Sequence, residues 1–300
     1  MRRSARRRRP AVTEKVAAGA ATVLISMLMA APAHAQLAAP NAAGVSMGHL
    51  HYHVRNVEEH VRFWTLLAGR PDAVVMFRPP REAAVLIHGT LVFPSAAESS
   101  GGSDGSVVNH VAFRVPTFAE LEARGLKIQR LDNFPGVGFT NTPEDERIEL
   151  FEDAALNLTF TPDQGAVDAV TGRHNRPLAT AVAFHHVHLY LPGEAHRDAK
   201  AWYARVFGGV GGKRAQYDAV DLPGINLNFG GGRITVPTKG RRLDHIGFEV
   251  RNLEAFCKRL ESMGVKLDTP YRKHADGIAS AMLTDPWGTS IELTEGLSAF

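Results

Sequence analysis

The sequence contains a single cysteine, Cys257, among 300 residues, which excludes an intramolecular disulfide. Neighbouring apolar residues recur at helical spacing, so we expect Cys257 to be a buried, inert thiol and not a nucleophile. The chain also lacks long apolar runs. No segment beyond residue 35 is apolar enough to cross a bilayer, which takes about 20 such residues.

Excess positive charge is also scarce outside the first 35 residues. The chain has a formal net charge of +3, but this segment holds seven basic residues and one acidic residue, so the remainder carries −3. A nucleic-acid binder would concentrate basic residues on its folded surface. We therefore expect no nucleic-acid partner.

Residues 1–35 resemble an export signal. A basic segment precedes a mostly apolar run at residues 16–30, and Ala33, His34 and Ala35 form a small-x-small cleavage pattern before Gln36. The apolar run is short for a membrane span of about 20 residues, so cleavage is favoured over an uncleaved anchor. We expect an exported protein, periplasmic in a bacterium or secreted, with no stable membrane insertion after cleavage.

The rest of the chain contains one pattern four times. Each module opens with a strand at or near a histidine, continues with a helix that ends at glycine, and closes with short strands. The opening histidines are His49, His110, His186 and His245. The expected helix ends are Gly69, Gly125, Gly208 and Gly264. Asn56 and Asn252 precede two of the helices and are suited to N-capping.

The spacing of the modules predicts two duplicated domains. The histidines at positions 49 and 110 are 61 residues apart, and those at positions 186 and 245 are 59 apart. A polar segment rich in Gly and Pro separates the second module from the third. We expect a flexible tether at 36–46, an N-terminal domain at 47–160, a linker at 161–181 and a C-terminal domain at 182–296.

Histidines on strands and glutamates on closing strands suggest metal ligation. A lone strand histidine is more often a core or surface residue than a ligand. Four at equivalent positions, joined by two equivalent glutamates, favour at least one metal site, because buried unpaired imidazoles and acids are costly. Two imidazoles and one carboxylate leave a divalent metal with open positions.

These features resemble the vicinal oxygen chelate superfamily, which includes glyoxalase I, extradiol ring-cleaving dioxygenases, and fosfomycin and bleomycin resistance proteins. The resemblance rests on four βαβββ modules, their opening histidines, and an Ile-Glu-Leu strand after an Asp-Pro-x-Gly turn, and it covers residues 47–296. It implies an α+β fold of four modules paired into two domains, each a cupped eight-stranded half-barrel around a metal.

The resemblance implies ligands residue by residue. The C-terminal metal site would comprise His186, His245 and Glu292. A possible second metal site would comprise His49, His110 and Glu149. In two-domain extradiol dioxygenases the N-terminal pair is usually degenerate, whereas both sets are complete here. We expect one divalent metal ion per active domain, with Fe²⁺ as the first choice and Zn²⁺, Mn²⁺ or Ni²⁺ as alternatives.

The signatures of individual family members fit only in part. His274 and the turn before Glu292 match the extradiol pattern, but Met282 stands where that pattern has tyrosine. Glyoxalase-type proteins take a further ligand from the closing strand of the partner module, where residues 91–93 and 226–229 offer no Gln or Glu. Candidate catalytic or substrate-contacting residues are His188, Tyr190, His274, Tyr271 and Arg272.

We therefore expect a metal-dependent enzyme that acts on a small molecule with vicinal oxygens, either dioxygenase-like or glyoxalase-like (a lyase or isomerase). One alternative is a non-catalytic small-molecule or drug-binding protein of the bleomycin-resistance type. Another is a metal-binding protein that uses the clustered histidines. The protein would be a monomer or a homodimer.

Overall fold

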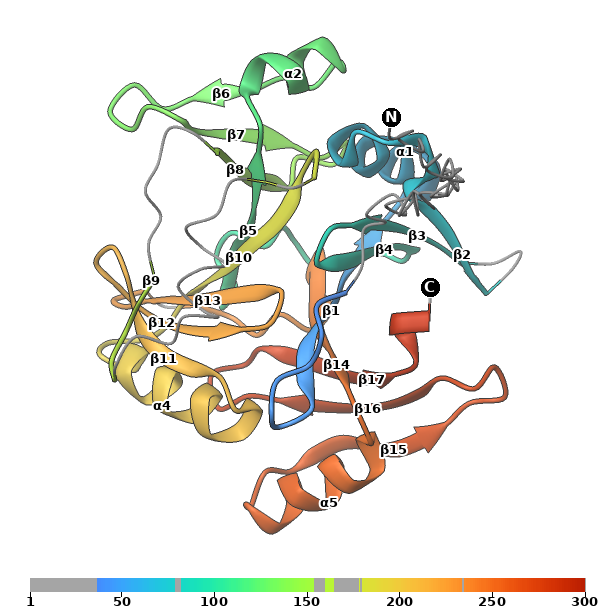
Figure 1. Ribbon diagram of the computed structural model, residues 1–300, viewed down its shortest axis with the longest axis vertical. Coiled ribbons are helices and arrows are strands. Elements are labelled where there is room, and N and C mark those ends of the chain that lie inside the picture. The colour runs from blue at the N-terminus through green and yellow to red at the C-terminus, as the bar shows by residue number, and fades with distance from the viewer. Residues whose placement is uncertain are drawn as a thin grey trace, which may run out of the picture. The chain divides into compact units, whose positions relative to one another are not determined.

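The structure is a computed structural model (Figure 1) that describes residues 37–78, 82–153, 160–164, 178, 180–233 and 235–299. All of these lie in one compact unit, His34–Phe300. The predicted export signal at 1–35 lies outside the described residues. Among the described residues, no helix is long and apolar enough to span a membrane.

Four modules with similar element order are present, as predicted. The first contains β1 (Val45–Val54), α1 (Val57–Ala68), β2 (Val74–Arg78), β3 (Glu82–Ile87) and β4 (Thr90–Ala96). The second contains β5 (Val108–Val115), α2 (Phe118–Ala123), β6 (Gln129–Arg130), β7 (Val137–Asn141) and β8 (Arg147–Glu152). The third contains β10 (Ala183–Tyr190), α4 (His196–Phe207), β11 (Val210–Arg214), β12 (Tyr217–Leu222) and β13 (Ile225–Gly230). The fourth contains β14 (Leu243–Val250), α5 (Leu253–Ser262), β15 (Leu267–Lys273), β16 (Ala279–Thr284) and β17 (Ser290–Glu295).

Strand pairing joins the modules differently from the expected grouping. β1 pairs with β14, which gives an eight-stranded sheet of order β15-β16-β17-β14-β1-β4-β3-β2 from the first and fourth modules. β5 pairs with β10, which gives a nine-stranded sheet of order β6-β7-β8-β5-β10-β13-β12-β11-β9. Figure 1 shows blue β1 beside orange β14, and green β5 beside yellow β10. The α+β fold is confirmed, but the modules pair first with fourth and second with third.

The register between β1 and β14 gives a physical reason for this pairing. His49 lies opposite Gly247, where a Cβ atom would overlap the His49 ring. Glycine therefore makes room for an inward imidazole at this crossing. The equivalent position opposite His186 in the second sheet is Ala112. The repeat itself does not reveal the pairing, because all four opening strands have similar apolar patterns.

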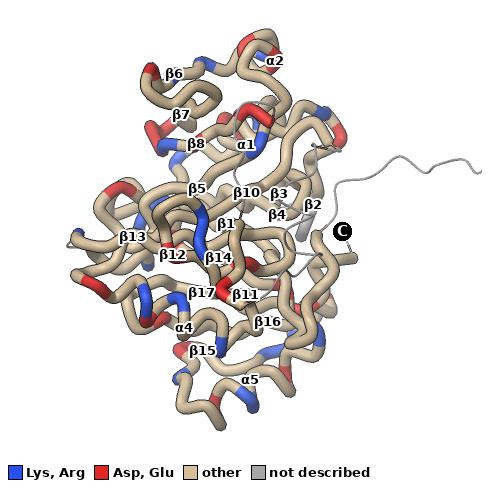
Figure 2. Tube along the Cα trace, turned by 60° about the vertical axis from the view of Figure 1, so that its left-hand side comes forward, with Lys and Arg blue, Asp and Glu red and all other residues tan. Residues whose placement is uncertain are grey.

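Helices α1 and α4 bury their apolar faces in one hydrophobic cluster that both sheets share. Trp64 of α1 lies 5.4 Å from Tyr52 of β1 and 5.8 Å from Phe113 of β5, between ring centroids. In α4, Phe207 lies 4.7 Å from Phe248 of β14 and Tyr203 lies 5.5 Å from Phe229 of β13, again between ring centroids. Each helix therefore packs between a strand of its own sheet and a strand of the other. Basic and acidic residues are interspersed along the trace (Figure 2).

The helix ends follow the expected chemistry except at α5. The Asn56 side chain accepts a hydrogen bond from the Glu59 N–H, and Gly69 ends α1 in the left-handed region at φ 73°. Asn252 does not cap α5 with its side chain, and its own φ is 59°. The Glu295 carboxylate instead accepts hydrogen bonds from the backbone N–H groups of Asn252 and Leu253, both at 3.0 Å. A residue at the end of β17 therefore replaces the predicted local cap.

The boundaries of the expected tether and linker also differ from the structure. Val45 and Ser46 of the tether (36–46) belong to β1 and are buried. The Asn41 side chain donates hydrogen bonds to the carbonyl groups of Phe207 and Gly208, both at 3.0 Å. The linker (161–181) begins inside β9 (Phe160–Pro162), which pairs with β11. The polar composition of both segments did not indicate these contacts. Much of the linker lies outside the described residues.

Candidate metal centres

The structure gathers the predicted ligands into two clusters, one on each sheet. Site A comprises His49, His51, His245 and Glu292, from β1, β14 and β17. Site B comprises His110, His186, His188 and Glu149, from β5, β10 and β8. The predicted sets are therefore divided differently: His186 joins the ligands of the second module, and His49 joins those of the fourth. This follows from the pairing of β1 with β14.

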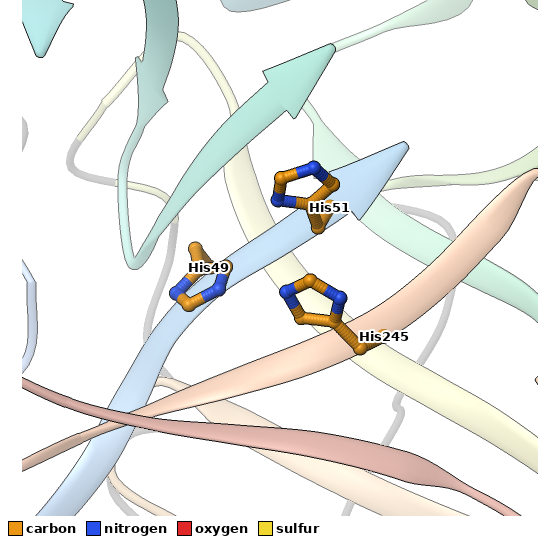
Figure 3. Close-up of side chains that lie close together, drawn as sticks. All are labelled: His49, His51 and His245. Atoms are coloured by element: carbon orange, nitrogen blue, oxygen red, sulfur yellow. The ribbon is translucent and has the colours of Figure 1, made fainter. Parts of the chain in front are cut away.

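In site A, one carboxylate oxygen contacts two imidazoles. Glu292 Oε2 lies 3.0 Å from His49 Nε2 and 3.3 Å from His245 Nε2. Ring nitrogens of His49, His51 and His245 all lie within 4.8 Å of one another. Figure 3 shows the three rings gathered in one space beside β1 and β14. This donor set and spacing suit a divalent metal ion.

Site B repeats this arrangement on the other sheet. Glu149 Oε2 lies 3.2 Å from His110 Nε2 and 3.3 Å from His186 Nε2. Ring nitrogens of His110, His186 and His188 also lie within 4.8 Å of one another, and all three residues are buried. The correspondence is positional, because His188 lies opposite His110 just as His51 lies opposite His245.

In each site, one histidine ring is held by the residue that precedes it in the chain: His245 in site A and His110 in site B. His245 Nδ1 lies 2.7 Å from the Asp244 carboxylate, and His110 Nδ1 lies 2.8 Å from the Asn109 amide oxygen. Both oxygens only accept hydrogen bonds, so each Nδ1 is a donor and each Nε2 faces the site. Metal-binding histidines are held in the same way by outer hydrogen bonds. The dipeptides Asp-His and Asn-His carry this signal in the sequence.

The charges in site A balance burial against pairing. Burial, with help from His245 and His49, lowers the pKa of His51 to about 3. Burial would also lower the pKa of His245, but its hydrogen bonds with Asp244 and Glu292 outweigh burial and raise it. Burial opposes ionisation of Glu292, yet hydrogen bonds with His245 and His49 hold its pKa well below the usual range. At neutral pH site A therefore holds an anionic carboxylate beside a neutral His51.

A cationic residue lies next to the ligands of site B. The buried Arg214 donates to the His185 ring, with Nη1 2.6 Å from Nε2, and His185 Nδ1 lies 2.8 Å from His186 Nδ1. Burial lowers the pKa of Arg214 to about 9 and that of His186 to about 4. Burial also opposes ionisation of Glu149, but hydrogen bonds with His110 and His186 keep its pKa well below normal. Site B therefore has a cation at its edge.

A cavity of about 240 Å³ adjoins site A. Its lining combines the ligands with an apolar wall and a few polar groups: His49, His51, Phe93, His245, His274, Ile278, Ser280, Met282, Glu292, Thr294 and Leu297. His274 Nε2 lies 2.9 Å from Ser280 Oγ. Met282 occupies the wall, so the tyrosine hydroxyl of the extradiol pattern has no counterpart at this position. The cavity can hold a small, largely uncharged molecule beside the ligands.

A larger hollow of about 730 Å³ lies elsewhere, against α1, β6 and β7. Its lining contains none of the predicted ligands, so volume alone does not identify the chemistry.

The remaining predicted site residues separate into two groups. His188 and Tyr190 lie at site B, where their rings stack with centroids 4.7 Å apart, and the Arg233 guanidinium lies 4.1 Å from the Tyr190 centroid. Tyr271 instead packs against the hydrophobic core, and Arg272 is exposed on β15. Neither lines the site A cavity. Loop position was therefore a poor guide, because these residues lie on an edge strand.

The residues of both sites fit a bound metal ion. His49 Nδ1 and His188 Nε2 are buried without hydrogen-bond partners. An unpaired buried polar atom costs free energy, which ligation or a water molecule would offset. Histidine and glutamate together suit Fe²⁺, Zn²⁺, Mn²⁺ and Ni²⁺.

One family model matches part of the chain, and solved structures of similar fold match most of it. Residues 183–293 match the model of the Glyoxalase/Bleomycin resistance protein/Dioxygenase superfamily. Glyoxalase I from Zea mays superposes with a TM-score of 0.54 at 15% identity, covering 85% of this chain and 94% of that one. A glyoxalase I mutant from the same plant gives a TM-score of 0.57, with the same identity and coverage. A putative dioxygenase from Bacillus subtilis gives 0.52 at 15% identity, covering 87% and 86%. No curated protein sequence matches the chain.

Proposed function

We propose that this chain belongs to the glyoxalase/bleomycin resistance/dioxygenase superfamily, whose model matches residues 183–293, and that it is a divalent-metal-dependent enzyme acting on a small molecule with vicinal oxygens at site A. One observation carries the proposal: His49, His245 and Glu292 converge at the wall of a cavity of about 240 Å³. Two opposed strands and a closing strand hold the three groups, so few rotamers must be frozen on binding.

A divalent metal held there supplies Lewis-acid polarisation of two neighbouring substrate oxygens. The chain provides the surroundings. Phe93, Met282 and Leu297 give the cavity an apolar wall, which would strengthen electrostatic contacts inside it where it keeps water away. His274 faces the same cavity and shares a proton with Ser280, so its ring can hold or move a proton at Nε2. Dioxygenase-like and lyase or isomerase chemistry both use such an arrangement.

Site B is proposed as a second, weaker metal site. It has equivalent donors, but the cationic Arg214 next to His185 opposes a second positive charge. Asn109 also replaces the carboxylate that Asp244 provides to site A.

Metal content tests the proposal most directly. The chain is purified without chelators or a histidine tag, and its metals are measured beside Glu292→Gln and Glu149→Gln. We expect the metal of site A to disappear only in Glu292→Gln. No metal in the wild-type chain, and no uptake on reconstitution, would remove the enzyme proposal and leave a small-molecule binder. Fe²⁺ is the first metal to test, followed by Zn²⁺, Mn²⁺ and Ni²⁺.

Export is a separate proposal that rests on residues 1–35. N-terminal sequencing of the protein recovered from the expressing cell should give Gln36 as the first residue. A chain that still begins with the basic segment would contradict cleavage.

A further inference from the structure

We propose that His51 is a fourth protein ligand of the site A metal, so that the metal is held by three histidines and one glutamate. The inference rests on the proposed function, because it requires that site A binds a metal. The additional ligand lies on β1, two residues after His49.

Strand geometry places His51 with the other donors. Side chains two residues apart on a strand point to the same face, and His49 and His51 both lie on β1. The strand presents both imidazoles to the space that His245 enters from β14 (Figure 3). His51 also lines the cavity beside Glu292.

Neighbouring rings fix the orientation of His51. Its ring stacks on His245 with centroids 4.5 Å apart and an interplanar angle of 28°. On the parallel neighbour strand, Phe93 is its register partner and stacks on it at 6.3 Å and 18°. These stacked neighbours restrict rotation of the imidazole. A restricted ring loses little conformational entropy when it binds a metal.

The distances between donors agree with ligation of one ion. In an octahedral site, donors about 2.1 Å from the metal lie about 3 Å apart when adjacent and about 4.2 Å apart when opposite. Glu292 lies 3.0 and 3.3 Å from its two imidazole partners, which suits adjacent positions. The three ring nitrogens lie within 4.8 Å of one another. The His51 nitrogen therefore lies in the same donor cluster as the nitrogens of His49 and His245.

The closing strand of the first module explains why β1 provides this ligand. The resemblance to glyoxalase-type proteins implies a ligand from that strand, but the residue beside His51 in β4 is Phe93. A phenyl ring does not ligate a metal. In this chain the aromatic ring supports His51 from the side, and the imidazole takes the place of the missing donor.

A fourth ligand limits the chemistry of site A. A six-coordinate metal with three protein donors keeps three positions, enough for a chelating substrate and a further small molecule such as O₂. With four protein donors it keeps two, and a substrate with vicinal oxygens fills both. The inference therefore favours lyase or isomerase chemistry over dioxygenation at this site.

The first test replaces the imidazole with a ligand that absorbs light. In a Glu149→Gln background, which isolates site A, His51→Cys is loaded with Co²⁺ under anaerobic conditions. Coordination of the new thiolate should give a strong charge-transfer band in the near ultraviolet. The parent chain contains the buried Cys257 and provides the blank.

His274→Cys is the matched control, because His274 lines the same cavity and is not part of the donor cluster. The band is expected in His51→Cys and not in His274→Cys. Circular dichroism verifies that each variant is folded. Folded, cobalt-loaded His51→Cys without the band would overturn the assignment, and so would equal bands in both variants.

The second test measures affinity by competition with a chelator. His51→Ala should bind Zn²⁺ at least about tenfold more weakly than the Glu149→Gln parent, whereas His274→Ala should stay within about twofold. Unchanged affinity in His51→Ala, with binding lost in Glu292→Gln, removes the fourth ligand and keeps the proposed function. A parent chain that binds no metal removes both.

A third measurement counts open positions. The Fe²⁺-loaded parent is saturated with acetohydroxamate, a bidentate oxygen chelator, and exposed to nitric oxide. Electron paramagnetic resonance should show an iron–nitrosyl signal in His51→Ala but none in the parent. A full signal in both proteins would contradict four-residue ligation.

Discussion

Sites A and B carry the same donors at equivalent strand positions but differ in the charges next to them. In site A, Asp244 holds the second histidine and adds a carboxylate to that of Glu292. In site B, the neutral Asn109 has this role, and the buried Arg214 lies one imidazole away from His186. The repeat preserves the ligands, whereas their neighbours decide how strongly each site attracts a cation.

The sites also differ in how tightly hydrogen bonds constrain two equivalent histidine rings, His49 in site A and His186 in site B. His49 Nδ1 is buried without a partner, whereas His186 Nδ1 faces His185 Nδ1 at 2.8 Å. Two ring nitrogens at this distance share one proton. The Arg214 N–H group donates to the same His185 ring, so a chain of hydrogen bonds constrains the tautomer of His186. A metal entering site B must compete with that chain.

The largest expected effect comes from removing each carboxylate in turn. Glu292→Gln should lower metal affinity at site A by more than about 100-fold, because a neutral amide is a poor ligand. Glu149→Gln should leave the tightly bound metal in place. Titration with a competing chelator measures both, and equal losses in the two variants would show that the sites are equivalent.

The next largest effect is expected from exchanging the residues that lie opposite His49 and His186 on the neighbouring strands. Gly247→Ala places a Cβ atom into the His49 ring and should displace that ligand, with loss of the site A metal. Ala112→Gly, at the equivalent position of site B, adds no atom and should retain metal binding there. Retention of the site A metal in a folded Gly247→Ala chain would contradict this account of the strand crossing.

A reciprocal exchange of the outer residues should move the affinities toward each other. Asp244→Asn should weaken metal binding at site A by about 10- to 100-fold, and Asn109→Asp should strengthen metal binding at site B by a similar factor. Isothermal titration of the metal-free variants measures both changes. If the two sites keep their difference in metal affinity, Arg214 would be its source, and Arg214→Met would then raise the affinity of site B.

A further expected effect concerns the acid stability of the metal-free chain and leaves metal binding aside. The pKa of His186 is about 4, below the usual value of about 6.5, so the unfolded chain binds a proton between these values that the folded chain rejects. Stability therefore falls as the pH drops from about 6.5 to about 4. His186→Gln should reduce this fall in the free energy of unfolding by an amount on the order of 3 kcal/mol.

His245 contributes a pH dependence of stability opposite in sign to that of His186, because its pKa is raised in the folded chain. The stability that it contributes is present below about pH 6.5 and is lost as the pH rises through its folded value. His245→Gln should therefore keep the fall in stability at acid pH, and it should remove the fall in stability that occurs as the pH rises through the pKa of folded His245. Urea unfolding with EDTA, at several pH values, separates the two variants. Parallel pH profiles would contradict the contrast.

The sequence predicted the modules well because each depends on local signals. Strand alternation, asparagine and glycine caps and the closing turn are all contained within about 60 residues. Module pairing is different. The His-x-His strands of the first and third modules can each join the second or the fourth, and both choices complete two sites. The pairing depends on contacts between distant strands, such as the fit of the His49 ring over Gly247, which local patterns do not reveal.

The same argument applies to individual site residues. The sequence predicted six candidate ligands in two sets, and the structure gathers the same six side chains into two different clusters, because cluster membership depends on strand pairing. His51 was visible as part of the His-x-His pattern, yet its stacking on Phe93 depends on the parallel pairing of β1 with β4. The misplaced Tyr271 and Arg272 show that a position shortly before the last strands does not imply contact with the site.

The pairing of β1 with β14 has a consequence for how the chain is made. Every donor of site B lies between positions 110 and 188, whereas site A joins position 49 to position 292. During synthesis from the N-terminus, the strand that carries Glu292 emerges nearly last. Contacts between distant segments form slowly, since a long loop must close first. The β14-facing edge of β1 therefore stays unpaired, and open to aggregation or chaperones, until most of the polypeptide has been released, whereas its other edge can pair early with β4.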